Sequence, residues 1–195
     1  MRLIICEFMS LDGVIQAPGG PDEDRDGGFE NGGWSMPFFD PATMGATYAE
    51  VLASTDALLF GRRTWQTMAA AWPDRAGDPF ADTMNAMPKY VASTSLGPDD
   101  LTWANTTLLG GGDAIGAVRQ LLDGSEGHLL VMGSVSLAQA LISEGLVDEF
   151  RIMIEPVTVG GGKRLFPDDG RLQPLRLVAS QLSATGVLIC HYEPQ

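Results

Sequence analysis

The chain has 195 residues, of which 45% are hydrophobic and 19% are charged, so it holds enough apolar side chains to build a core. This balance excludes an intrinsically disordered chain. Lys and Arg number 12 against 25 Asp and Glu, and the net charge of -13 repels phosphate backbones and anionic lipid surfaces. We therefore expect neither nucleic acid nor a membrane as a partner. The apolar N-terminal run meets Glu7 too early for a secretory signal, and the apolar stretch 129–142 is too short for a membrane span, which predicts a soluble, cytoplasmic protein.

Short apolar runs alternate with helix-like segments along most of the chain. The predicted strands, in order, are 2–9, 57–60, 89–92, 106–109, 129–132 and 150–154, followed by two more near 176–179 and 186–192. The predicted helices are 41–53, 64–71, 114–122 and 135–144. This order predicts one α/β domain over residues 1–195, with a mostly parallel sheet and an antiparallel C-terminal finish.

Glycine, proline and aspartate mark the predicted loops. Residues 17–37 form a long loop that ends in an apolar cluster around Trp34, and a loop of this length is commonly functional or mobile. Its carboxylates at 22–26 are expected to form a solvated acidic surface. A second such loop follows residue 71. Gly110–Gly112 is predicted to be a plain loop, because Ile115 stands where a dinucleotide fingerprint needs its third glycine. Gly160–Gly162 is predicted to be a hairpin or bulge turn, beside which Lys163 and Arg164 could reach an anion.

Metal and hydrolase chemistry find little support. Cys6 and Cys190 lie inside apolar runs and are expected to be buried free thiols. Neither His128 nor His191 has the spacing of a metal ligand set, and no G-x-S-x-G segment is present. The sequence therefore predicts no metal site.

Three predicted strands run directly into glycine or hydroxyl residues at their carboxyl ends, where ligands of α/β sheets bind. Taken singly, each junction is more commonly a turn and a helix cap. Together they suit a ligand with several phosphates, because helix N-termini and guanidinium groups bind phosphate. The candidate binding residues are Gly61, Arg62, Arg63 and Thr64 at the first junction, Ser93, Thr94 and Ser95 at the second, and Gly133, Ser134, Val135 and Ser136 at the third.

The same junctions resemble segments of the dihydrofolate-reductase-like superfamily, in the branch of the riboflavin-biosynthesis reductase domain. The match covers nearly the whole chain. Its segments are Ser10-Leu-Asp-Gly-Val-Ile15, Leu59-Phe-Gly-Arg-Arg-Thr-Trp65, Val91-Ala-Ser-Thr-Ser95, Val131-Met-Gly-Ser134, Leu146-Val-Asp-Glu-Phe-Arg151 and Gly160-Gly-Gly-Lys-Arg-Leu-Phe166. Ser134 departs from the family by replacing the second glycine of a G-G pair. The resemblance implies a three-layer αβα fold whose central mixed sheet is mostly parallel and ends in an antiparallel hairpin.

The resemblance also implies NADPH as cofactor, with its phosphates at the three junctions, and hydride transfer to a small, flat heterocycle. The loop carrying Trp34 and Met36 would close over the substrate. Asp40 follows Trp34 at nearly the spacing of the folate reductases' carboxylate, which makes it a candidate acid and substrate ligand, although helix capping is an alternative role. Glu50 is a further candidate acid. Reduction of a ribosylaminouracil phosphate, folate reduction and a non-catalytic nucleotide-binding protein all remain open, and the branch implies a homodimer.

Overall fold

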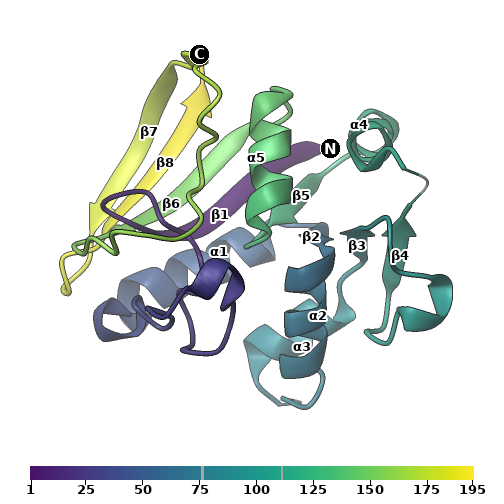
Figure 1. The fold of residues 1–195 in the computed structure, drawn as a ribbon, viewed down its shortest axis with the longest axis horizontal. Helices are drawn as coiled ribbons and strands as arrows, with labels where there is room; N and C mark the ends of the chain where they lie inside the picture. The colour runs from purple at the N-terminus through teal and green to yellow at the C-terminus, as the bar shows by residue number, and fades with distance from the viewer. Residues whose placement is uncertain (76, 111) are drawn as a thin grey trace.

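The computed structural model describes residues 1–75, 77–110 and 112–195, arranged around one eight-stranded sheet with the order β4-β3-β2-β5-β1-β6-β8-β7 (Figure 1). The strands are β1 (Arg2–Ser10), β2 (Ala57–Gly61), β3 (Lys89–Ala92), β4 (Thr106–Leu109), β5 (His128–Val131), β6 (Glu149–Glu155), β7 (Leu175–Leu182) and β8 (Leu188–Pro194). The first six strands pair in parallel, and β8 and β7 then pair antiparallel at one edge. This confirms the predicted mixed sheet with its C-terminal hairpin.

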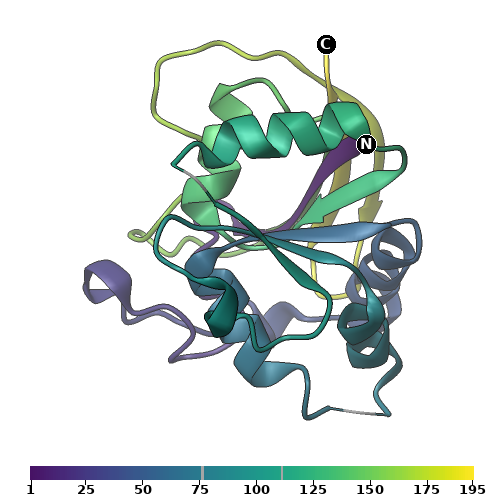
Figure 2. The same cartoon turned by 90° about the vertical axis from the view of Figure 1, so that its right-hand side faces the viewer.

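Helices cover both faces of the sheet and give three layers, which Figure 2 shows nearly edge-on. The helices are α1 (Ala46–Ala53), α2 (Arg62–Ala71), α3 (Pro79–Ala86), α4 (Ala114–Gly124) and α5 (Val135–Ser143). One buried cluster joins the sheet to α1, α2 and α3, and a second joins it to α4 and α5. Because residues alternate between faces along a strand, Ile4 and Cys6 enter the first cluster while Leu3 and Ile5 enter the second.

The central strands are buried on both faces, as their continuous apolar sequences predict. In β1 the side chains from Leu3 to Cys6 are at most 3% exposed. Cys6 and Cys190 are both buried free thiols, as expected, and burial raises the pKa of Cys6. Among the described residues, no helix combines the length and the apolar character that a membrane crossing requires.

Three local expectations were wrong. Residues 79–86, expected as part of a loop, form α3, whose first turn is capped by the Asp78 carboxylate through the N–H groups of Phe80 and Ala81. An aspartate followed by a proline is a helix-start signal, and it marks this helix in the sequence. Helix α2 begins at Arg62 rather than Thr64, so both arginines lie in its first turn.

The third wrong expectation concerns Gly160–Gly162, which lies in the long connection from β6 to β7 rather than in a hairpin. The Asp12 carboxylate accepts hydrogen bonds from the N–H groups of Val159 and Gly160 and from the Ser10 hydroxyl, and these bonds lower its pKa to about 2. The Ser10–Gly13 turn therefore fixes this connection to the end of β1. Of the Gly110–Gly112 loop, Gly111 lies outside the described residues.

The long loop after β1 has a small core of its own. Val14, Ala17, Phe29 and Trp34 form a separate buried cluster, and the indole N–H of Trp34 donates to the Gln16 carbonyl at 2.8 Å. After this loop, the chain makes a π-helical turn over Pro41–Gly45 and continues into α1. The loop is thus a packed element over the carboxyl end of β1.

Candidate active site

The three sequence-predicted junctions lie together at one edge of the sheet. Strands β5, β2 and β3 are neighbours, with Val131 opposite Leu59 and Ala92 opposite Gly61. The segments that leave their carboxyl ends are Gly133–Ser136, Gly61–Thr64 and Ser93–Ser95. The parallel arrangement therefore brings three chain corners, distant in sequence, to adjacent positions.

The corners after β2 and β5 are in direct contact. The Gly61 N–H donates to the Ser134 hydroxyl at 2.8 Å. Gly133 has φ +66°, and a Cβ added there would meet Thr64 Cγ2 at 3.0 Å. Glycine suits this position because a side chain there would be strained by the positive φ and would crowd Thr64.

Ser134, which departs from the family pattern, takes the left-handed conformation with φ +64°. That region is costly for residues with a Cβ, by about 1–2 kcal/mol. Its hydroxyl is engaged by Gly61, so Ser134 joins the two corners. It also precedes α5, whose first residues, Val135 and Ser136, present backbone N–H groups toward the same edge.

Arg62 and Arg63 stand in the first turn of α2, where the helix dipole disfavours cations. Arg62 bonds Gln66 at 3.2 Å, and Arg63 forms an ion pair of 2.6 Å with Asp26 from the long loop. Both guanidinium groups thus stand at the positive end of a helix, and a carboxylate of the long loop already pairs with Arg63.

The corner after β3 is built around Ser93. Its hydroxyl, which is buried, accepts hydrogen bonds from the N–H groups of Ser95 and Leu96. Thr94 and Ser95 are exposed. Ser93 therefore shapes the turn, and the hydroxyl of the exposed Ser95 lies 3.5 Å from its own.

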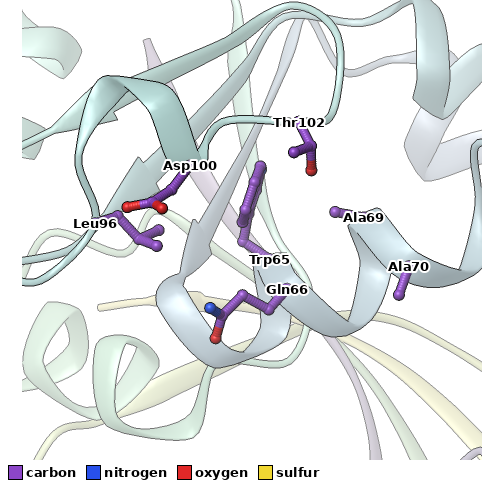
Figure 3. Close-up of a pocket in the computed structure, with 7 residues that line it drawn as sticks. All are labelled: Trp65, Gln66, Ala69, Ala70, Leu96, Asp100 and Thr102. Carbon is purple, nitrogen blue, oxygen red and sulfur yellow. The ribbon is translucent and has the colours of Figure 1, made fainter.

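A hollow of about 270 Å³ opens beside this corner, between α2 and the segment 96–102 (Figure 3). One wall is formed by Trp65, Gln66, Ala69 and Ala70 of α2, and the other by Leu96, Asp100 and Thr102. The Trp65 indole, which is 2% exposed, donates to Thr106 Oγ1. The hollow is smaller than most small-molecule sites, so it suits one end of an extended ligand.

The acidic residues 22–26 are not simply solvated, contrary to the expectation. Asp26 Oδ2 lies 2.6 Å from an Arg63 nitrogen and 3.0 Å from Lys163 Nζ, and Asp24 lies 2.7 Å from the same Lys163. These ion pairs lower the pKa of Asp26. The loop is thus attached to α2 and to the 160–163 segment, and a hollow of about 520 Å³ lies between the loop and that segment.

The three expected substrate residues are placed differently from one another. Trp34 is only 8% exposed within the loop's own core, whereas Met36 is 57% exposed. Asp40 caps the following turn by accepting hydrogen bonds from the Ala42 N–H and the Thr43 hydroxyl, and these bonds lower its pKa. Asp40 is therefore an anion at neutral pH and fits the capping role. Glu50 is exposed on α1.

Two buried carboxyl groups were missed by the sequence analysis. Glu7 in β1 is 3% exposed and Glu155 at the end of β6 is fully buried, and each has an oxygen without a hydrogen-bond partner among the described residues. Burial raises the pKa of Glu7 well above its usual range and that of Glu155 to about 7. The signal was present, since Glu7 interrupts an otherwise apolar run in a strand expected to be covered on both faces.

A group of possible metal ligands, Glu149, His191 and Glu193, lies at the opposite edge of the sheet. Guanidinium groups already bond its carboxylates: Arg151 pairs with Glu149, while Arg2 and Arg176 pair with Glu193. Burial lowers the pKa of His191. Because its negative charges are neutralised by arginines, we assign this cluster a structural role.

The layered mixed sheet, with the three corners at one edge, is the αβα arrangement that the resemblance implies. The chain belongs to the RibD C-terminal domain family, which it matches over residues 2–189. A curated relative, the uncharacterised protein YyaP of Bacillus subtilis (strain 168), is 28% identical over 192 residues, covering 96% of this chain and 92% of that protein.

Several solved structures share the fold over 100% of this chain. A putative riboflavin biosynthesis protein from Shewanella sp. PV-4 has a TM-score of 0.74 at 18% identity, with 99% of that chain covered. A pyrimidine reductase-like protein from Corynebacterium diphtheriae has a TM-score of 0.67 and a sequence identity of 16%, with 92% of that chain covered. A third similar structure is the diaminohydroxyphosphoribosylaminopyrimidine deaminase/5-amino-6-(5-phosphoribosylamino)uracil reductase of Thermotoga maritima. Its TM-score is 0.68 and its sequence identity 12%, with 56% of that chain covered.

Proposed function

We propose that this protein is an NADPH-dependent oxidoreductase that reduces a small heterocyclic molecule. The observation that carries the proposal is that the three corners after β2, β3 and β5, whose residues suit phosphate binding, lie together at one sheet edge. Arg62 and Arg63 stand there in the first turn of α2. The RibD C-terminal family and the reductase names of two structurally similar proteins support the same class. Bound NADPH would supply the hydride, and the chain supplies position and shielding.

The residues at the corners fit a phosphorylated dinucleotide. Arg62 and Arg63 offer guanidinium groups, which bind phosphate bidentately, and exposed Thr94 and Ser95 offer hydroxyls beside them. Gly133 keeps the first turn of α5 open, because a side chain there would meet Thr64. The free N–H groups of that turn add donors for a second phosphate.

The long loop is proposed to shield the substrate. Its core around Trp34 keeps it folded, and its exposed Met36 supplies an apolar surface for a flat ring. Water exclusion by such loops favours hydride transfer. In this arrangement Trp34 acts through the loop's packing, and Met36 is the residue that a substrate can touch.

The ion pairs of the loop favour a substrate without a phosphate group. Lys163, a cation that the sequence offered for a substrate phosphate, is already bonded to Asp24 and Asp26. A phosphate entering the adjacent hollow would face the carboxylates of Asp26 and Glu30, which line it. The Lys163 contacts therefore give no support to the ribosylaminouracil phosphate, and the lowered pKa of Asp40 gives no support to a folate-type acid.

The proposal is tested by titrating NADPH and NADH into wild-type protein and the variant R62A/R63A, following cofactor fluorescence. Loss of charge-assisted bonds to the 2′-phosphate should weaken NADPH binding by roughly 10–100-fold. NADH binding should change little. Arg119→Ala, which removes a surface arginine paired with Glu144 on the far side of the sheet, is the matched control.

Equal losses for both dinucleotides in R62A/R63A, or no loss, would contradict this assignment. Oxidation of NADPH with a panel of pyrimidines, pterins and their phosphorylated forms then tests turnover. Binding without turnover of any candidate would favour a non-catalytic nucleotide-binding protein.

A further inference from the structure

Glu7 is a buried acid in the middle of an apolar strand. It is 3% exposed, and its Oε1 has no hydrogen-bond partner among the described residues. Burying a carboxyl with an unmatched oxygen costs free energy, because water would otherwise satisfy it. Asp12, by contrast, has its carboxylate satisfied by two backbone N–H groups and a hydroxyl. Folding alone therefore does not explain Glu7.

The position of Glu7 connects it to the candidate cofactor site. Ile5 of β1 lies opposite Val131 of β5, so Glu7, two residues further on, lies beside Gly133 on the same face. The Gly133 backbone lies close enough to the Glu7 carboxyl to lower its pKa, against the larger effect of burial. Gly133 itself is partly exposed and contacts the corner that carries Thr64. Glu7 thus lies next to the corner that a bound dinucleotide would approach.

The groups around Glu7 keep it uncharged. Burial and the nearby Glu23 carboxylate both raise its pKa, and the Gly133 backbone opposes them. Cys6 and Tyr48 pack on the other face of the sheet, and their own pKa values are raised chiefly by burial and further by the Glu7 carboxyl. A neutral carboxyl can donate and accept at once, and it does not repel a phosphate.

We propose that Glu7 is a cofactor-binding residue, whose free oxygen forms a hydrogen bond with an amide or hydroxyl group of the dinucleotide seated at Gly133. This inference rests on the proposed function. It assigns Glu7 to a part of the ligand that NADPH and NADH share, whereas Arg62 and Arg63 act on the phosphate that distinguishes them. It also couples binding to protonation, because an ionised Glu7 would face the nucleotide as a second anion.

The test compares Glu7→Leu and Glu7→Gln with wild-type protein in unfolding and in dinucleotide titrations. Glu7→Leu should be at least as stable as wild type, since it removes a buried unmatched acid. It should nevertheless bind NADPH and NADH about tenfold more weakly, the effect of losing one hydrogen bond. Glu149→Gln, the same change to a buried carboxyl at the start of the neighbouring strand β6, should leave both affinities unchanged.

A pH series gives a second readout. Wild-type affinity should fall as pH rises through the Glu7 titration, with proton uptake seen by calorimetry in buffers of different ionisation heat, and Glu7→Gln should show no such fall. Wild-type affinities in Glu7→Leu, a loss of stability in that variant, or an unchanged pH profile in Glu7→Gln would each overturn the assignment of Glu7. Failure of wild-type protein to bind either dinucleotide would instead overturn the proposed function.

Discussion

At the scale of single residues, Ser134 shows how a departure from the family pattern is accommodated. Its left-handed backbone is the conformation that glycine adopts freely, yet the serine hydroxyl accepts a bond from Gly61 and joins β5 to β2. The cost of the conformation is offset by a contact that glycine could not make. Ser134 is therefore a structural part of the candidate site.

Two substitutions separate these contributions. Ser134→Ala keeps the backbone cost and loses the hydrogen bond, so it should destabilise the protein by about 1 kcal/mol. Ser134→Gly loses the bond but relieves the conformation, so it should stay within about 0.5 kcal/mol of wild type. Urea denaturation measures both. Equal destabilisation by the two variants would show that the backbone of Ser134 is not strained.

Glu155 gives a pH prediction. Its pKa is raised from 4.5 to about 7, chiefly by burial, so the native state binds a proton that the unfolded state releases. Stability from this group is full below pH 4.5 and is lost as pH rises through 7. Glu155→Gln should therefore stabilise the protein by about 3 kcal/mol at pH 8 and have little effect at pH 4. Thermal unfolding across pH decides this, and a variant less stable at pH 8 would contradict it.

At the scale of elements, the sequence predicted regular structure well where apolar periodicity was strong. Strands 89–92 and 106–109 have the predicted bounds. Helix α3 was missed because its signal is the Asp78-Pro79 cap rather than a long apolar stripe. The acidic loop was misjudged for a different reason: the partners of Asp24 and Asp26 are far away in sequence, and the fold alone brings Lys163 and Arg63 to them.

The contacts within the candidate site were also hard to predict, because they join residues that are far apart in sequence. Each corner was visible as a strand running into glycine or hydroxyl residues, and the parallel sheet makes such ends neighbours. The contact between Gly133 and Thr64 and the left-handed Ser134 depend on tertiary packing. Buried acids such as Glu155 escaped because a strand-end carboxylate is commonly exposed.

The contact between Asp26 and Arg63 predicts that the loop competes with a phosphate for this arginine. Asp26→Asn should free Arg63 and tighten NADPH binding by roughly threefold, in keeping with the small energy of an exposed ion pair. NADH affinity should change less. Asp22→Asn, which affects a carboxylate paired only within the loop to Arg25, serves as the control. Weaker NADPH binding by Asp26→Asn would show that Asp26 positions Arg63 instead of competing for it.

At the scale of the whole molecule, one edge of the sheet is left uncovered. Strand β7 is exposed along nearly all its length, and it shows Leu177 at 50%, Val178 at 42% and Leu182 at 68% exposure. Exposed apolar edge strands favour pairing with another strand. We propose that two copies of the chain pair along this edge, as the riboflavin-type resemblance implies.

Sedimentation equilibrium tests the pairing. Wild-type protein should have the mass of a dimer at micromolar concentration, and Leu182→Lys should shift it toward the monomer because the new charge opposes burial. A wild-type protein that stays monomeric throughout would exclude this pairing.

The central claim is that the edge formed by β5, β2 and β3 binds a phosphorylated pyridine dinucleotide. A crystal structure of the protein soaked with NADP⁺ tests it most directly. We predict that the phosphates lie against Arg62, Ser95 and the first turn of α5, with the nicotinamide half beside Glu7. A dinucleotide bound elsewhere on the molecule, or its absence at saturating concentration, would contradict the account.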